Sequence, residues 1–151
     1  MVFKPLNISH WDKLRVGINQ KILLEFLSDG NFTDVHTIIQ DFVYNFGLEH
    51  GLNSEKEFRV ERRNDTDEIN GLIDVVWSQD DYKVLIEIDS TPRDKSLYKL
   101  LHNESIHKVW IYCCTDKFDK YMRDHKSDLE NIIMIPILSY KYLRRTMRKK
   151  I

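Results

Sequence analysis

Two long stretches near the start of the chain carry hydrophobic residues at helical spacing. The first runs from about Trp11 to Leu27 and ends at the polar segment 28–31. The second begins after Thr33, a residue type that caps helices, and continues until Gly51. Its stripe consists of Val35, Ile38, Ile39, Phe42, Val43 and Phe46. Recurrence of this kind predicts two amphipathic helices.

The middle of the chain changes to the patterns typical of strands. From Glu55 to Arg63, Phe58 and Val60 alternate with charged neighbours, which predicts a half-exposed strand. Two apolar strands follow at 71–77 and 82–89, and the short polar turn 78–81 between them favours an antiparallel hairpin. Strand geometry places Leu72, Asp74 and Val76 on one face and Ile73, Val75 and Trp77 on the other.

The rest of the chain alternates helices and strands. Thr91, Pro92 and Asp94 predict the start of a helix that continues to about Glu104 and buries Leu97, Leu100 and Leu101. The continuous apolar run 109–114 is typical of a strand covered on both faces. A charge-rich helix from about Lys117 to Glu130, an edge-like strand at 132–137 containing Pro136, and a basic helix complete the order. Trp77 and Trp110 lie in apolar strands and are predicted core residues, whereas the role of Trp11 stays open.

The elements predict an α/β fold, more narrowly an α+β fold with a mixed sheet. The 151 residues fit one domain, and no composition shift divides them. Within that domain we expect a helical extension at 1–30, a core at 33–138 and a basic C-terminal helix at 139–151.

Asp74, Glu87 and Asp89 lie in strands that are otherwise built for burial. Glu87 and Asp89 share a face, and the hairpin brings Asp74 close to them. An apolar strand tolerates negative charge only when something cationic meets it. Hard oxygen ligands of this kind suit magnesium or manganese. The alternative is that Asp89 caps the turn into the next helix while Asp74 and Glu87 pair with arginines.

Glu49 continues the hydrophobic stripe of the second helix by one more turn. It is either a partly exposed residue at the helix end or a fourth acid of the same site. The neighbouring His50, and His36 off the stripe, are weaker candidate ligands.

The segment Gly71-Leu72-Ile73-Asp74, followed by Glu87-Ile88-Asp89, resembles the core motif of the PD-(D/E)XK, or restriction-endonuclease-like, nucleases. The order of elements from about Thr33 to Leu138 is also similar to the common core of that family. The resemblance implies a nuclease of the restriction or junction-resolving type, with DNA favoured over RNA as substrate. It further implies Mg²⁺ or Mn²⁺ held by Asp74, Glu87 and the Ile88 carbonyl, and it favours a role for Glu49.

One position departs from that family pattern. The family normally has a lysine two residues after the second acid, where this chain has Asp89. Some relatives use an acid there, and others, including the cap-snatching endonucleases of segmented RNA viruses, take the lysine from the following helix. Lys95 and Lys99 lie on that predicted helix. Lys95 is closer to Asp89 along the chain, whereas Lys99 has the more similar spacing but points away from the leucine face.

The missing lysine keeps a second function open: a nucleic-acid-binding or assembly protein that retains the nuclease fold without turnover. For either function, basic residues around the site are candidate phosphate contacts. These are Arg59, Arg62, Arg63 and Arg93 near the strands, and Arg144, Arg145 and Arg148 in the basic tail. Charge separated in this way, with a formal net charge of −1, suits a polyanionic partner, although a solvated helix end explains the tail equally well.

The remaining features concern compartment and assembly. Cys113 and Cys114 are adjacent, cannot form an ordinary disulfide framework and lack zinc-site spacing, so both are predicted to be buried. No apolar run reaches membrane-spanning length, and the N-terminus lacks a signal-peptide core. We therefore expect a soluble, intracellular and cytoplasmic protein with no membrane partner. Small nucleases are often dimers, so a homodimer is open.

Overall fold

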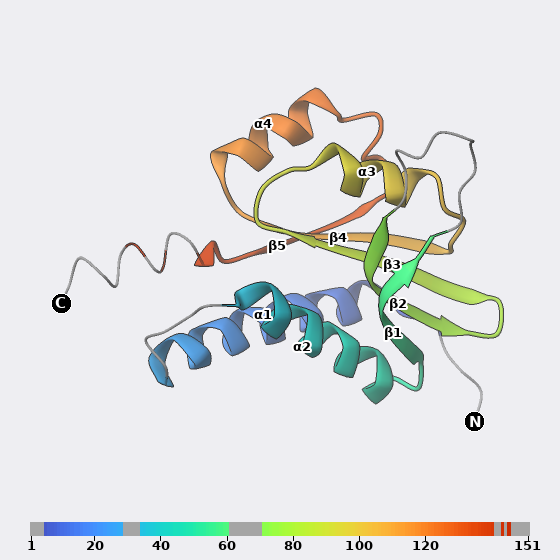
Figure 1. Cartoon of the computed structure of the whole chain (residues 1–151), viewed down its shortest axis with the longest axis horizontal. Coiled ribbons are helices and arrows are strands. Elements are labelled where there is room, and N and C mark those ends of the chain that lie inside the picture. Colours follow the sequence, from blue (N-terminus) through green and yellow to red (C-terminus); the bar gives the residue numbers. More distant parts are fainter. Residues whose placement is uncertain (1–4, 29–33, 61–70, 141–142, 144, 146–151) are drawn as a thin grey trace.

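The computed structural model describes residues 5–28, 34–60, 71–140, 143 and 145. Within these ranges it is an α+β fold with a five-stranded mixed sheet and four helices, which confirms the coarse prediction. Helices α1 (Ile8–Ser28) and α2 (Val35–Glu49) cover one face of the sheet. Helices α3 (Asp94–Leu101) and α4 (Asp116–Asp124) cover the other face (Figure 1).

The sheet has the strand order β1-β2-β3-β4-β5, the order of the chain itself. Strands β1 (Asn53–Arg59), β2 (Leu72–Gln79) and β3 (Tyr82–Asp89) form an antiparallel meander. Strands β4 (His107–Cys113) and β5 (Ile133–Ile137) then add in parallel to β3. The carboxyl ends of β3, β4 and β5 therefore lie at one edge of the sheet. The predicted edge position of the Pro136 strand is confirmed.

Several predicted helix boundaries are wrong. Helix α2 is capped by Asp34, whose side chain accepts from the Thr37 N–H at 3.2 Å, and not by Thr33. Helix α3 begins at Asp94 after Arg93 rather than after Thr91, and its N-cap makes no side-chain hydrogen bond. Helices α3 and α4 also end earlier than predicted, at Leu101 and Asp124.

Hydrophobic residues pack on both faces of the sheet, so the central strands are covered on both sides. Trp77 lies in the layer under α1 and α2, where its ring stacks on Trp11 with centroids 6.2 Å apart. Trp110 lies in the layer under α3 and α4, edge-on to Phe118. Trp77 and Trp110 are fully buried, which confirms them as core residues, and Trp11 is buried as well. Leu101, in contrast, is 36% exposed and not part of this core.

The sides of strand β2 do not alternate as expected. Val75 and Trp77 pack toward α1 and α2, whereas Ile73 packs with Val76 toward α3 and α4. The break falls at Asp74, and its partner position in β1 is Glu57, a non-glycine residue with a positive φ of 53°. The predicted sharing of one face by Ile73, Val75 and Trp77 is therefore wrong, because the regular pleat is interrupted at Asp74.

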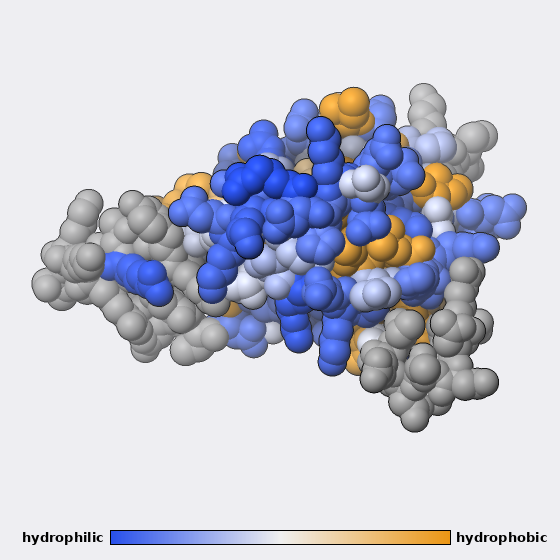
Figure 2. Space-filling view, turned by 90° about the horizontal axis from the view of Figure 1, so that it is seen from above, coloured by the Kyte–Doolittle hydropathy of each residue, from blue (hydrophilic) through white to orange (hydrophobic). Residues whose placement is uncertain are grey.

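The face that carries α3 and α4 is mostly hydrophilic with a few separate hydrophobic patches (Figure 2). Cys113 is buried as predicted, but Cys114 is exposed. Within the described ranges, no helix combines the length and hydrophobicity that a membrane span requires. Arg62, Arg63, Arg144 and Arg148 lie outside the described residues, as does most of the predicted basic C-terminal helix.

Candidate active site

Strands β2 and β3 separate at Asp74, and the candidate site lies at this point. Regular pairing runs from Gln79–Tyr82 to Val75–Ile86 and stops there. Past it, Asp74 Oδ2 accepts a hydrogen bond from the Ile88 N–H at 2.7 Å. The Asp74 carbonyl accepts instead from Gln40 Nε2 of α2 at 2.9 Å. Backbone groups released by the separation are thus satisfied by side chains, as buried polar groups require.

Asp74 and Glu87 form a carboxyl pair. Glu87 is only 1% exposed and hydrogen-bonds with Asp74. Burial, together with the charge and hydrogen bond of Asp74, raises the pKa of Glu87 to about 9. Burial alone would raise the pKa of Asp74 too, but hydrogen bonds with His36, Glu87 and the Ile88 N–H hold it below its ordinary value. In the metal-free protein at neutral pH the pair therefore shares a proton.

His36 reaches this pair from the first turn of α2. Its Nε2 lies 3.4 Å from Asp74 Oδ1. The hydrogen bond with Asp74 raises the pKa of His36, and the negative charges of Asp74, Asp89 and Glu57 act in the same direction against burial. The Oδ1 atom of Asp74 is thus in contact with an imidazole.

Lys99 approaches Glu87 from α3. Its Nζ lies 2.5 Å from Glu87 Oε1 and donates to the Leu72 carbonyl at 2.9 Å. The lysine stem passes over Gly71, where a Cβ would be 2.5 Å from Lys99 Cδ. Lys99 is off the leucine face of α3, and its long stem carries the ammonium group to Glu87.

Asp89 lies beside the pair but is held by other partners. The Trp110 indole N–H donates to Asp89 Oδ2 at 2.8 Å, and Ser96 also hydrogen-bonds with this carboxylate. Burial raises the pKa of Asp89, while these two hydrogen bonds and the charge of Arg93 oppose that rise. Its oxygens are therefore engaged in fixing β3 to β4 and α3.

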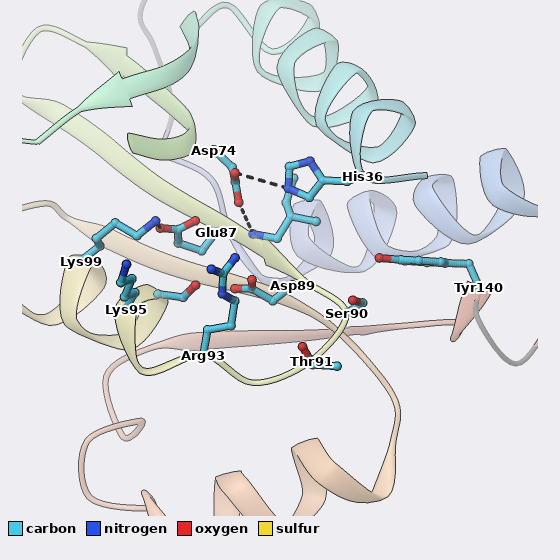
Figure 3. A pocket seen from close by; sticks show the side chains of 12 residues that line it. His36, Asp74, Glu87, Asp89, Ser90, Thr91, Arg93, Lys95, Lys99 and Tyr140 are labelled. Carbon is cyan, nitrogen blue, oxygen red and sulfur yellow. Dashed lines mark hydrogen bonds and ion pairs between the residues drawn. The ribbon is translucent and has the colours of Figure 1, made fainter. Parts of the chain in front are cut away.

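These side chains line one pocket of about 360 Å³ (Figure 3). Asp74 points toward His36 from β2, Glu87 and Asp89 come from β3, and Lys99 and the exposed Lys95 come from α3. The other lining residues are Ile88, Ser90, Thr91, Arg93, Ser96 and Tyr140. The structure thus brings together the predicted Asp74, Glu87, Ile88, Asp89, Arg93, Lys95 and Lys99.

Glu49 does not lie at this pocket. It is at the opposite end of α2 from His36, roughly 20 Å along the axis at about 1.5 Å per residue. There it lines a separate pocket with Lys21, Glu25 and Asn45. Since the N-terminal end of α2 faces Asp74, the structure does not support the prediction that Glu49 is a fourth acid of the site.

The arginines predicted to contact phosphate are distributed differently. Arg59 is exposed on β1 and does not line the pocket, whereas Arg93 does. Arg145 is exposed and lines a neighbouring pocket. Of the predicted arginines that the structure describes, Arg93 thus lies at the pocket of the carboxyl pair and Arg145 lies at the neighbouring pocket.

The donor chemistry of the pocket suits a divalent cation, because two carboxyl groups and an imidazole lie in contact. The pKa of Glu87 is raised to about 9, so the pair binds a proton that a cation could replace. Among the described residues, however, no group of three or more His, Cys, Asp or Glu side chains has the arrangement of a formed metal site. The imidazole of His36 contacts Asp74, and the carboxylate of Asp89 accepts from Trp110. Either side chain would have to give up its present partner to become a metal ligand.

Sequence reasoning undervalued His36 and missed Gln40 and Ser96 as parts of the site. His36 and Gln40 are one turn apart on α2, a spacing that places both on one helix face. That spacing is the available signal, but it becomes informative only once α2 is known to cross β2.

We found no family model, no curated protein and no solved structure that matches this chain.

Proposed function

We propose that this protein is a metal-dependent nuclease that hydrolyses phosphodiester bonds in nucleic acid. The observation that carries the proposal is the buried Asp74–Glu87 pair with the Lys99 ammonium 2.5 Å from Glu87 in an open pocket. Burying two carboxyl groups together is unfavourable, and packing alone does not require it. Titratable groups perturbed in this way and gathered at a pocket are typical of active sites.

The topology supports the same proposal. An antiparallel three-stranded meander, a crossover helix and a parallel strand form the arrangement that resembles the PD-(D/E)XK core. The two acids lie on the second and third strands of that meander. We therefore propose a restriction-endonuclease-like fold as the framework of the site.

Mg²⁺ or Mn²⁺ would be held by the Asp74 and Glu87 carboxylates, with the Ile88 carbonyl and His36 as the nearest further donors. Carboxylate and carbonyl oxygens suit both cations, whereas an imidazole is a softer ligand and favours manganese. When bound, the cation supplies positive charge that offsets the charge of the phosphodiester and makes water a stronger nucleophile.

Lys99 is the proposed catalytic lysine. Two of its three N–H groups are directed at Glu87 and the Leu72 carbonyl, so the third can be donated to the attacking water or to a phosphate oxygen. Such a donor stabilises negative charge that develops during hydrolysis. Arg93 and Lys95, both exposed at the pocket, can hold the phosphates on either side of the scissile bond.

The competing function is a nucleic-acid-binding protein without turnover, which the replacement of the usual lysine by Asp89 would favour. Lys99 weakens that argument, because it brings an ammonium group to the second acid from the following helix. We therefore prefer the catalytic proposal.

The test is cleavage of end-labelled single-stranded, duplex and branched DNA, and of RNA, with Mn²⁺, with Mg²⁺ and with EDTA. We expect cleavage only with a divalent cation, and Asp74→Asn should lower its rate at least about 100-fold because the amide carries no charge to hold the cation. Binding without cleavage under every condition would favour the non-catalytic function. Cleavage that persists in EDTA would overturn the metal-dependent mechanism.

A further inference from the structure

A second pocket adjoins the candidate active site. It has a volume of about 910 Å³ and shares Ser90 and Thr91 with the first pocket. Its wall comes from the segments that follow β3, β4 and β5, and from α1. Figure 3 shows Ser90 and Thr91 on the side of Asp89 away from Lys99, so the two pockets meet at the carboxyl end of β3.

The charged side chains that line the second pocket are mostly cationic. Arg15 of α1, Lys117 of α4 and Arg145 line it, whereas Asp116 is the acidic residue among the lining side chains. The first pocket combines three carboxyl groups with Arg93, Lys95 and Lys99, so the second pocket has the larger excess of positive charge. A polyanion is therefore attracted to the second pocket.

The floor of the second pocket is apolar and fixed by backbone hydrogen bonds. It contains Pro136, Ile137 and Leu138. The Cys114 N–H donates to the Ile137 carbonyl at 3.1 Å, and the Leu138 N–H donates to Asn19 Oδ1 at 2.9 Å. This floor offers a nonpolar surface next to the three cationic groups.

We propose that the second pocket binds a single strand of nucleic acid and leads it past Ser90 and Thr91 into the candidate active site. Phosphates lie on Arg15, Lys117 and Arg145, and an unstacked base lies against Pro136 and Leu138. We call the second pocket and the passage past Ser90 and Thr91 the groove. The assignment rests on the proposed nuclease function, because the groove ends at the candidate active site. A duplex offers such a surface only its phosphates, whereas a single strand offers phosphates and free base faces together.

The direct test is binding of fluorescent oligonucleotides in EDTA, where no cleavage occurs. The variant is Arg15→Ala with Lys117→Ala, and the matched control is Lys13→Ala with Lys120→Ala, which removes two exposed lysines outside the groove from the same two helices. We expect the first variant to weaken single-strand binding at least about 10-fold and to lower the slope of log affinity against log salt by about 2. The control should bind like the wild type.

Cys114 supplies an independent readout, because it is exposed and lines the groove while Cys113 is buried. Saturating single-stranded oligonucleotide should slow maleimide labelling of Cys114 at least about threefold, since bound nucleic acid excludes the reagent. Cys114→Ser controls for labelling elsewhere. DNA and RNA oligonucleotides are compared separately, and tighter binding of either supports the groove and identifies the sugar it prefers.

Two outcomes overturn the groove. One is a duplex that binds as tightly as a single strand of the same sequence. The other is unchanged affinity of the Arg15/Lys117 variant together with unchanged Cys114 labelling. If this second outcome occurs while cleavage remains dependent on Asp74, the groove is wrong and the nuclease function stands. If single strands bind the groove but are not cut with any cation, the groove stands and the nuclease function is wrong.

Discussion

The Trp110 indole N–H donates a hydrogen bond to Asp89 Oδ2 across the parallel pair β3 and β4, over 2.8 Å. This contact gives Asp89 a structural partner at the position where the PD-(D/E)XK motif, which the sequence resembles, has a lysine. Together with the hydrogen bond of Ser96, it accounts for an acid in a mostly buried place. The catalytic ammonium group is then free to come from α3, as proposed for Lys99.

Trp110→Phe should lower the free energy of unfolding by about 1–3 kcal/mol, because the phenyl ring leaves an oxygen of Asp89 without its donor. Urea denaturation measures the change. In Trp110→Phe combined with Asp89→Ala, the loss should be smaller than the sum of the two single losses, since neither partner remains unpaired. Strict additivity would contradict a coupled pair.

Lys99→Met should lower the rate of cleavage about 10²–10⁴-fold while the protein still binds oligonucleotide, because a donor used in the transition state is lost. Lys95→Met is the matched control from the same helix and the same pocket. Single-turnover cleavage at saturating enzyme separates the two. A larger effect of Lys95→Met would show that Lys99 is not the catalytic lysine.

Gly71→Ala should lower cleavage about 10-fold or more, because the added Cβ displaces the Lys99 stem that now passes over Gly71. Gly51→Ala is a useful comparison. Gly51 has a φ of 80° and open space around its Cα, so alanine there strains the backbone without touching the site. It should destabilise the protein by roughly 1 kcal/mol and leave the cleavage rate of the folded enzyme unchanged. Equal cleavage rates for the two variants would contradict this use of Gly71.

The metal-free protein should become less stable as the pH rises from about 5 to 9. The pKa of Glu87 is raised to about 9 and that of His36 is also raised, so in this range the folded state binds more protons than the unfolded state. Stability contributed by these groups is therefore complete below their unfolded pKa values and is lost toward higher pH. Glu87→Gln should make the profile flatter, because the amide does not titrate. Thermal melting in EDTA across this range gives the measurement, and a wild-type profile that rises toward pH 9 would contradict the shared proton.

Local patterns were sufficient to place Asp74 and Glu87 together. The polar turn fixes the register of β2 and β3, and the turn residue Asp80 has the positive φ of 52° that tight hairpins use. Once Gln79 pairs with Tyr82, Asp74 must lie opposite Glu87. Hydrophobic periodicity likewise predicts the five described strands and the four described helices.

Contacts between distant elements had no comparable signal. Helix periodicity predicts which face of α2 is buried but not which end meets Asp74, so the sequence alone favours Glu49 over His36. The same limit explains Lys99: its position on the helix wheel is off the leucine face, and only the packing of α3 beside Gly71 turns the ammonium group inward. The pleat break at Asp74 depends on tertiary hydrogen bonds from Gln40 and is invisible to a period of two.

The separation of β2 from β3 also makes a backbone amide sensitive to the chemistry of the site. The Ile88 N–H donates to a titratable side chain, that of Asp74 on β2, instead of to a backbone carbonyl. A cation that takes Asp74 oxygens competes directly with that N–H, so the Ile88 amide is a built-in spectroscopic reporter. In a ¹⁵N-labelled sample its proton resonance should move upfield on saturation with Mg²⁺ as the hydrogen bond weakens, while the amide of Val84 inside the regular ladder stays in place.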